Sequence, residues 1–227
     1  MKNHFLNRIV KENTLYFYSF FAFGLIAGVA LIFIDKGDFI LFFSERRSVF
    51  GDAFFRFVTL LGEVYVYFIA LIGLLFYRYR YAIILPAIGV SVALLSYFTK
   101  EFFAHERPFL YYKNLDLLDS IQFVEGIHVN GGTTSFPSGH TMSAFAFYTF
   151  LVLVLPKKNW ISAALIILAL LVGVSRIYLV QHFLQDVVVG AAIGVCLGVF
   201  WFWFNTKYPK QPHSWLDKCL LSGRKQV

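Results

Sequence analysis

Six uncharged, apolar runs divide the chain, and short polar segments separate them. The runs are Leu15–Ile34, Val64–Tyr77, Tyr81–Thr99, Thr141–Leu155, Asn159–Ser175 and Val187–Thr206. A helix that crosses a bilayer needs about 20 apolar residues. The second run reaches this length when Phe57–Gly62 and the single acid Glu63 join it, and the fourth when Phe136–His140 form its outer end. The pattern therefore predicts an all-α bundle of six transmembrane helices in a single membrane-embedded domain, residues 1–227.

The first run follows a basic start, as the apolar core of a secretory signal would. Its 20 residues exceed the length of such a core, which is about 7–15 residues. No small-x-small cleavage site follows before Asp35. We interpret this run as a first span that is retained.

The segment between the first two runs mixes charges with phenylalanines. Its apolar residues recur at helical spacing and comprise Phe39, Phe43, Phe50, Phe54, Phe57 and Leu61. Most of its charged residues fall elsewhere on the helical wheel. This pattern predicts an amphipathic helix that lies in the outer membrane interface or packs on the ends of the bundle.

Lysine and arginine set the orientation of a membrane protein. With the N-terminus inside, the inner segments are 1–14, 78–80, 156–158 and 205–227, and they hold 12 of the 20 basic residues. We therefore expect the protein to lie in the inner (cell) membrane with both termini in the cytoplasm. The net charge of +7 then reflects topology and attraction to anionic lipid, and we expect no nucleic-acid partner.

Composition agrees with a membrane domain, since 59% of the residues are hydrophobic and 15% are charged. An ordinary soluble domain is about half apolar and about a quarter charged. The two cysteines, Cys196 within a span and Cys219 in the C-terminal tail, predict neither a structural disulfide nor a metal site.

Two polar clusters flank the long outer loop, residues 100–136. The first, "KEFFAHERP", places Lys100 and Arg107 seven residues apart, so that both can project from one face of a helix. The second, "FPSGHT", opens the fourth run with Pro137 and Ser138, which are signals of a helix N-terminus. Such a terminus offers free backbone N–H groups to an anion, and Gly139 allows close approach of a ligand.

A third cluster, "SRIYLVQHFLQD", separates the fifth and sixth runs. His182 and Asp186 are four residues apart, which places them on one face of a helix and within hydrogen-bonding reach. All three clusters lie on the outer side under the topology above. Their cations, Lys100, Arg107 and Arg176, would bind a compact anion such as phosphate.

The same clusters contain candidate catalytic groups. His182 backed by Asp186 has the arrangement of a nucleophile and the residue that orients it. His140 can protonate a leaving oxygen because histidine titrates near neutrality. No carboxylate cluster points to a metal ion, so we expect no metal and no cofactor.

These residues resemble the three-part signature of the type 2 phosphatidic acid phosphatase superfamily, which comprises integral-membrane lipid phosphatases. The signature reads Lys-x6-Arg-Pro, Pro-Ser-Gly-His and Ser-Arg-x5-His-x3-Asp. The matching residues are Lys100, Arg107, Pro108, Pro137 to His140, Ser175, Arg176, His182 and Asp186. Spacing and order both agree, and the six-span layout extends the similarity to most of the chain.

The resemblance implies a metal-independent reaction through a phosphohistidine. His182 would attack phosphorus, oriented by Asp186, and His140 would give a proton to the leaving group before water hydrolyses the intermediate. The remaining site residues would hold the equatorial phosphate oxygens, namely Lys100, Arg107, Arg176 and the amides of Ser138 and Gly139.

Three other classes of protein remain as alternatives. A transporter would carry charge near the middle of a span, where the sequence offers only Glu63, about two turns deep if the span starts at Phe57. We expect Glu63 to pair with a neighbouring cation or to cap the site. A vanadate haloperoxidase of the same superfamily would be soluble, and a non-catalytic lipid-binding relative would not need the full set of acid, nucleophile and orienter.

The substrate class follows from the position of the site at the membrane interface. A phosphomonoester or pyrophosphate on a membrane lipid fits, with lateral access between spans. Phosphatidylglycerol phosphate, phosphatidic acid and undecaprenyl pyrophosphate all fit, and so does lipid A for a phosphatase or phosphotransferase of the same superfamily. Packing of the loop residues 109–136 chooses among them, and the sequence does not place this loop or define an oligomeric state.

Overall fold

The computed structural model describes residues 2–207 and 215–221, and the regular structure within these ranges is helical. The longer helices are α2 (Thr14–Phe33), α5 (Val64–Tyr77), α6 (Tyr79–Phe103), α8 (Gly139–Val154), α9 (Asn159–Tyr178) and α10 (Leu184–Lys207). The shorter elements are α1 (Lys2–Glu12), α3 (Asp38–Glu45), α4 (Val49–Leu60), α7 (Pro108–Asn114) and the 3₁₀ turns η1 (Leu118–Ser120) and η2 (Trp215–Asp217).

The protein is an integral membrane protein with several helices of membrane-spanning length. Within the described residues, α2, the segment Tyr79–Asn114, α9 and α10 are each long and apolar enough to cross a bilayer. The pair α4 and α5 provides a fifth span only if both helices, which meet at an angle of 54°, count as one. The remaining apolar helix, α8, has 16 residues and is shorter than these spans.

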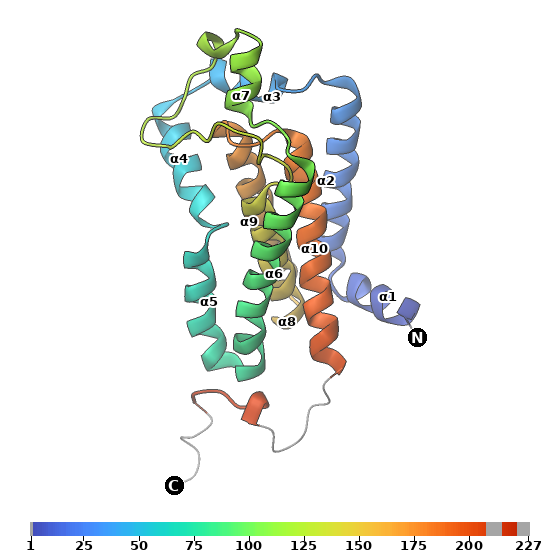
Figure 1. The fold of residues 1–227 in the computed structure, drawn as a ribbon. Coiled ribbons are helices and arrows are strands. Elements are labelled where there is room, and N and C mark those ends of the chain that lie inside the picture. Colours follow the sequence, from blue (N-terminus) through green and yellow to red (C-terminus); the bar gives the residue numbers. More distant parts are fainter. Residues whose placement is uncertain (1, 208–214, 222–227) are drawn as a thin grey trace.

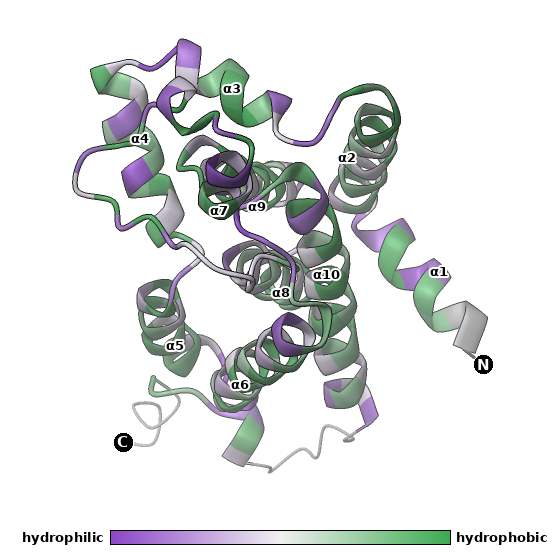
Figure 2. Cartoon of the chain, turned by 45° about the horizontal axis from the view of Figure 1, so that its top comes forward, coloured by the Kyte–Doolittle hydropathy of each residue, from purple (hydrophilic) through white to green (hydrophobic). Residues whose placement is uncertain are grey.

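Helix α8 lies at the centre of the bundle, and the other long helices surround it (Figure 2). Most of its residues are buried, whereas the apolar side chains of α2, α5 and α6 are largely exposed on the outside. Three glycines of α10 at four-residue intervals allow the closest contact with α8, namely Gly190, Gly194 and Gly198. A Cβ at any of them would lie 2.5–2.7 Å from a backbone oxygen of α8 or of its N-cap residue, Ser138. Small residues at such intervals allow two membrane helices to pack with their backbones close together.

The short elements gather at the two ends of the bundle (Figure 1). Helices α3, α4 and α7 lie at the end where α6 and α9 finish and where α8 and α10 begin. Helix α1 and η2 lie at the opposite end. The functional side chains predicted from the sequence therefore stand at the end that is remote from α1.

The prediction of a single amphipathic helix after the first span is wrong. The chain forms two helices, α3 and α4, separated at residues 46–48. Ser48 starts α4 because its hydroxyl accepts a hydrogen bond from the backbone N–H of Gly51 at 3.0 Å. Phe50 and Phe57 of α4 remain 79% and 62% exposed, which agrees with an apolar face turned toward lipid.

The predicted continuation of the second span through Phe57–Glu63 is also interrupted. Helix α4 ends at Leu60, α5 begins at Val64, and the two helices meet at 54°. The hydroxyl of Tyr148 in α8 donates a hydrogen bond to the carbonyl oxygen of Leu61 at 3.1 Å. A helix break exposes backbone groups that need such partners, and α8 supplies one.

Candidate active site

The structure brings the predicted site residues to one end of the bundle from elements between α6 and α10. Lys100 stands in the last turn of α6, Arg107 precedes α7, and Ser138, Gly139 and His140 open α8. Arg176 lies in the last turn of α9, His182 lies between α9 and α10, and Asp186 is in the first turn of α10. Most of these side chains are buried, including those of Arg107, Arg176, His182 and Asp186. Charged groups this deep need partners, and each has one.

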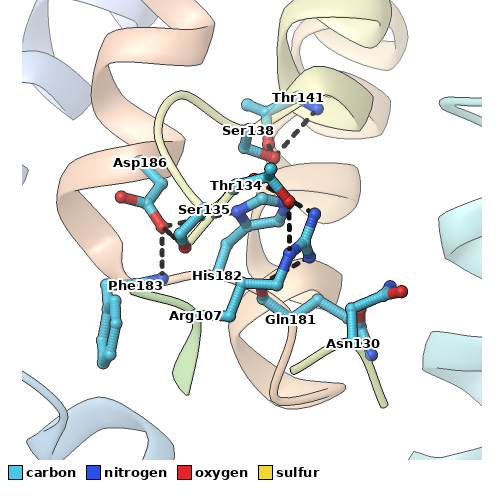
Figure 3. Close-up of polar contacts among 10 residues, drawn as sticks. All are labelled: Arg107, Asn130, Thr134, Ser135, Ser138, Thr141, Gln181, His182, Phe183 and Asp186. Atoms are coloured by element: carbon cyan, nitrogen blue, oxygen red, sulfur yellow. Dashed lines mark hydrogen bonds and ion pairs between the residues drawn. The ribbon is translucent and has the colours of Figure 1, made fainter. Parts of the chain in front are cut away.

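His182 and Asp186 are in direct contact (Figure 3). Nδ1 of His182 lies 3.3 Å from Oδ2 of Asp186. The same carboxylate oxygen accepts hydrogen bonds from Oγ of Ser135 at 2.5 Å and from the backbone N–H of Phe183 at 3.0 Å. An ionised carboxylate only accepts hydrogen bonds, so Nδ1 carries the proton and Nε2 keeps its lone pair.

The spacing had predicted that His182 and Asp186 lie on one face of a helix, but the pair does not form in this way. Helix α9 ends at Tyr178 and α10 begins at Leu184, so His182 lies in the connecting turn. Its backbone N–H donates to the carbonyl oxygen of Arg176 at 3.2 Å. Asp186 reaches back from the first turn of α10, where a carboxylate is favoured by the helix dipole.

Burial lowers the pKa of the His182 imidazole to about 4. Asp186 acts in the opposite direction by stabilising the charged ring, while the nearby Arg176 and Arg107 disfavour a further positive charge. The ordinary value for histidine is about 6.5. His182 is therefore neutral at pH 7, which is the form that can act as a nucleophile.

We expect His182 to titrate near pH 4 in a nuclear magnetic resonance experiment on ¹⁵N-histidine-labelled protein in detergent, assigned with the His182→Gln variant. The unfolded chain takes up this proton near pH 6.5, so the folded state binds fewer protons between the two values. The contribution of His182 to stability is complete above about pH 6.5 and is lost as the pH falls toward 4. Titration of His182 at pH 6 or above would contradict this environment.

Arg107 is held by the long outer loop. Its Nε and Nη2 donate to Oγ1 and the carbonyl oxygen of Thr134 at 3.3 and 3.2 Å, and its Nη1 donates to the carbonyl oxygen of Gln181 at 3.3 Å. The side chain of Gln181 in turn accepts a hydrogen bond from Asn130 (Figure 3) and donates one to the carbonyl oxygen of His128. Loop residues 128–134 are thereby fastened to the residue that precedes His182.

Lys100 and Arg107 do not share one helix, contrary to the prediction from their spacing. Helix α6 ends at Phe103, and Ala104 adopts a left-handed conformation with φ of 46°. The chain turns there, and Arg107 then stands as the N-cap of α7 with Pro108 at its first position. The two cations still lie within electrostatic range of each other, because the turn returns Arg107 toward the bundle.

The N-terminus of α8 has the geometry that its sequence predicts. Ser138 is the N-cap, and its Oγ accepts hydrogen bonds from the backbone N–H and the hydroxyl of Thr141 at 3.4 and 2.9 Å. A Cβ at Gly139 would lie 2.9 Å from Oγ of Ser96 and 3.7 Å from Nζ of Lys100. The ammonium group thus lies beside the helix start, an arrangement that is suited to binding an anion.

Arg176 and His140 have partners on the break between α4 and α5. Nη1 of Arg176 donates to Oγ1 of Thr59 at 2.6 Å. Nε2 of His140 lies 3.2 Å from Oε1 of Glu63. The sequence had suggested that Glu63 pairs with a neighbouring cation or caps the site, and the structure places it against His140.

Sequence reasoning missed three other contacts. They are the contacts of Ser135 with Asp186, of Thr59 with Arg176, and of Thr134 and Gln181 with Arg107. Each contact joins residues that are far apart in the chain. No motif marks these partner residues, since all are neutral, and only Gln181 falls within one of the polar clusters. Within the described ranges, no three or more His, Cys, Asp or Glu side chains are grouped closely enough to hold a metal ion.

Residues 79–210 of the chain match the family model of the PAP2 superfamily. This region runs from the start of α6 to the segment after α10, and it contains Lys100, Arg107, His140, His182 and Asp186. Thr59 and Glu63 lie outside it.

The chain is similar to lipid A 4′-phosphatase of Porphyromonas gingivalis, with 27% identity over 177 residues that cover 71% of this chain and 72% of the relative. Its fold is similar to that of LpxE from Aquifex aeolicus, with a TM-score of 0.62 and 32% identity, covering 76% of this chain and 95% of that one. A PAP2-type phosphatidylglycerolphosphate phosphatase from Bacillus subtilis has a TM-score of 0.63 and 26% identity, covering 85% and 97%. The chain therefore belongs to the PAP2 superfamily.

Proposed function

We propose that this protein is an integral-membrane phosphatase that hydrolyses a phosphomonoester or pyrophosphate of a membrane lipid through a phosphohistidine at His182. The observation that carries the proposal is the buried, neutral imidazole of His182, held through Nδ1 by Asp186 with Arg107 and Arg176 close by. Membership of the PAP2 superfamily and the lipid phosphatases among the relatives support the same reaction.

In the first step, Nε2 of His182 attacks phosphorus and forms a P–N bond while the P–O bond to the lipid breaks. The leaving oxygen takes a proton from His140. Asp186 keeps the proton on Nδ1 of His182 and stabilises the positive charge that develops on the ring. In the second step, water attacks phosphorus, gives its proton to His140 and releases phosphate as the P–N bond breaks.

Positive charge around the phosphate supplies most of the stabilisation in such a transfer. We assign this role to Lys100, Arg107, Arg176 and the backbone amides of Ser138 and Gly139. Nε of Arg176 is buried and, within the described part of the chain, has no hydrogen-bond partner. A buried donor of this kind needs an acceptor, and a phosphate oxygen of the substrate would provide one.

An apolar cavity beside the site supports a lipid substrate. Its volume is about 390 Å³, and its lining comprises Val64, Tyr67, Phe68, Leu71, Leu85, Pro86, Gly89, Val90, Ala93 and Ser143. Ser143 stands one turn after His140 on α8, so the cavity lies close to the proton donor. Such a cavity between α5, α6 and α8 would receive the hydrocarbon chain of the lipid while the phosphate reaches His182.

We further propose six membrane crossings, with α8 as the short central one and the bent pair α4–α5 as another. The protein then lies in the inner membrane with both termini in the cytoplasm, and its active site opens on the extracytoplasmic side. The basic residues of the segments 1–14 and 205–227 support this orientation. The whole chain, residues 1–227, acts as one phosphatase domain.

One assay of phosphate release tests the reaction and its substrate class. The purified protein in detergent is given phosphatidylglycerol phosphate, phosphatidic acid, undecaprenyl pyrophosphate or lipid A, each with and without EDTA. We expect release from at least one of these lipids at a rate that EDTA leaves unchanged, because the cations of the site do the work of a metal. Release that requires an added divalent metal would contradict the mechanism, and release from none of the four lipids would contradict the substrate class.

A further inference from the structure

The break between α4 and α5 touches the active site at two points. Thr59 in the last turn of α4 accepts the hydrogen bond from Arg176, and Glu63, which directly precedes α5, contacts His140. Thr59 and Glu63 are four residues apart, so a single short segment reaches two groups that act on the phosphate.

Packing holds this segment tightly against α8 and α9. A Cβ at Gly62 would lie 2.7 Å from Cγ1 of Val172 in α9 and 3.0 Å from the backbone oxygen of His140. Any residue other than glycine would therefore push the segment away from the site. The hydrogen bond from the hydroxyl of Tyr148 in α8 to the carbonyl oxygen of Leu61 anchors the same segment.

The side chain of Glu63 is directed to the site and not to its own helix. Glu63 occupies the N-cap position of α5, yet its carboxylate makes no capping hydrogen bond. It contacts Nε2 of His140 instead, and both side chains are 32% exposed. A carboxylate that served only as the N-cap would be expected to accept hydrogen bonds from the free backbone N–H groups at the start of α5.

Glu63 is negatively charged, whereas the other charged or titratable groups that act on His140 carry or can carry positive charge. Those groups are Lys100 from α6, Arg107 from the loop, Arg176 from α9 and the titratable ring of His182. The other carboxylate of the site, Asp186, already accepts three hydrogen bonds. A general acid must be protonated before it can act, and three neighbouring cations oppose its protonation.

We propose that Glu63 is a positioning residue for His140, which it holds through Nε2 and stabilises in the protonated form, so that Nδ1 delivers the proton to the leaving oxygen. The structure gives Nδ1 of His140 no hydrogen-bond partner among the described residues, which leaves it for the substrate. After the transfer His140 is neutral, and it recovers a proton from the water that attacks the phosphohistidine. This inference rests on the proposed role of His140 as the acid.

The test uses two soluble substrates that differ in their leaving groups, decyl phosphate and nitrophenyl phosphate. An alkoxide needs a proton to leave, whereas a nitrophenolate does not. We expect Glu63→Gln to lower kcat/KM about tenfold for decyl phosphate and less than about threefold for nitrophenyl phosphate. We also expect the alkaline limb of the pH profile of kcat/KM for decyl phosphate to move down by roughly one pH unit, because the amide does not stabilise the imidazolium.

Two further variants make the result specific. Glu63→Asp keeps the negative charge. The alkaline limb of its pH profile should therefore lie close to that of the unchanged protein, even if its rate is low. Glu45→Gln removes a charge from the exposed surface of α3, where the side chain of Glu45 is 69% exposed, and it should match the unchanged protein. Equal losses of Glu63→Gln on both substrates with an unmoved pH profile would overturn the inference and assign Glu63 a purely structural role.

The His140→Ala variant separates this inference from the proposed function. If it shows the large dependence on leaving group and Glu63→Gln shows none, only the role of Glu63 falls. If His140→Ala shows no such dependence, the assignment of His140 as the acid falls together with that of Glu63.

Discussion

Substitution of His182 by alanine is expected to lower lipid phosphate release by a factor on the order of 10⁵–10⁶, because no other group can form the P–N bond. His182 is 2% exposed and neutral, with Nδ1 held at 3.3 Å from Oδ2 of Asp186. The attacking atom, Nε2, is thus the only ring nitrogen that keeps a lone pair. The measurement is the initial rate of phosphate release in detergent from the lipid that the intact protein hydrolyses best.

The control for this change is Arg8→Ala, which removes an exposed side chain from α1 at the opposite end of the bundle and should leave the rate unchanged. A thermal unfolding scan of His182→Ala should show a folded protein. Label from a radioactive lipid phosphate, trapped by rapid denaturation, should appear on residue 182. Label on residue 140 would assign the nucleophile to His140 and contradict the mechanism.

Replacement of Asp186 by asparagine is expected to lower kcat by about 10²–10⁴-fold with little change in KM. Oδ2 of Asp186 accepts hydrogen bonds from Ser135, Phe183 and His182, and it supplies the negative charge that balances the ring as the P–N bond forms. An asparagine can offer its NH₂ group to Nδ1, which would move the proton to Nε2 and block the attack. Steady-state kinetics on the preferred lipid measure the effect.

Ser135→Ala is the matched comparison, because it removes one of the three donors to the same oxygen and leaves the charge in place. It should cost only a few-fold in kcat, in line with the loss of about 1 kcal/mol for one hydrogen bond. A kcat of Asp186→Asn within tenfold of the intact protein would show that Asp186 does not orient His182.

The membrane character of the chain was predictable because apolar runs and their lengths are local properties. Helices α2, α6, α9 and α10 each coincide with one of the predicted runs. The predictions failed where a helix had to be continuous, at residues 46–48 and again at Leu61–Glu63. Apolar periodicity continues through both positions, so only contacts with other helices reveal the breaks, such as that of Tyr148 with the carbonyl oxygen of Leu61.

The same distinction applies to the site. Helical spacing correctly suggested that His182 and Asp186 make contact, although they do so across a turn and not along a helix. Spacing also suggested one helix for Lys100 and Arg107, but Ala104 takes a left-handed conformation and turns the chain between them. A period of seven residues reports a shared face only while the helix continues.

By itself, the sequence determined the family and the membrane-embedded helices and indicated the candidate site residues, because these depend on residue type, order and local spacing. Only the tertiary structure decided that Glu63 contacts His140, that Thr59 contacts Arg176 and that Ser135 contacts Asp186. These pairs are 77, 117 and 51 residues apart in the chain. Contacts over such separations arise from the packing of α4, α5, α8, α9 and α10 around one another, and no local pattern encodes them.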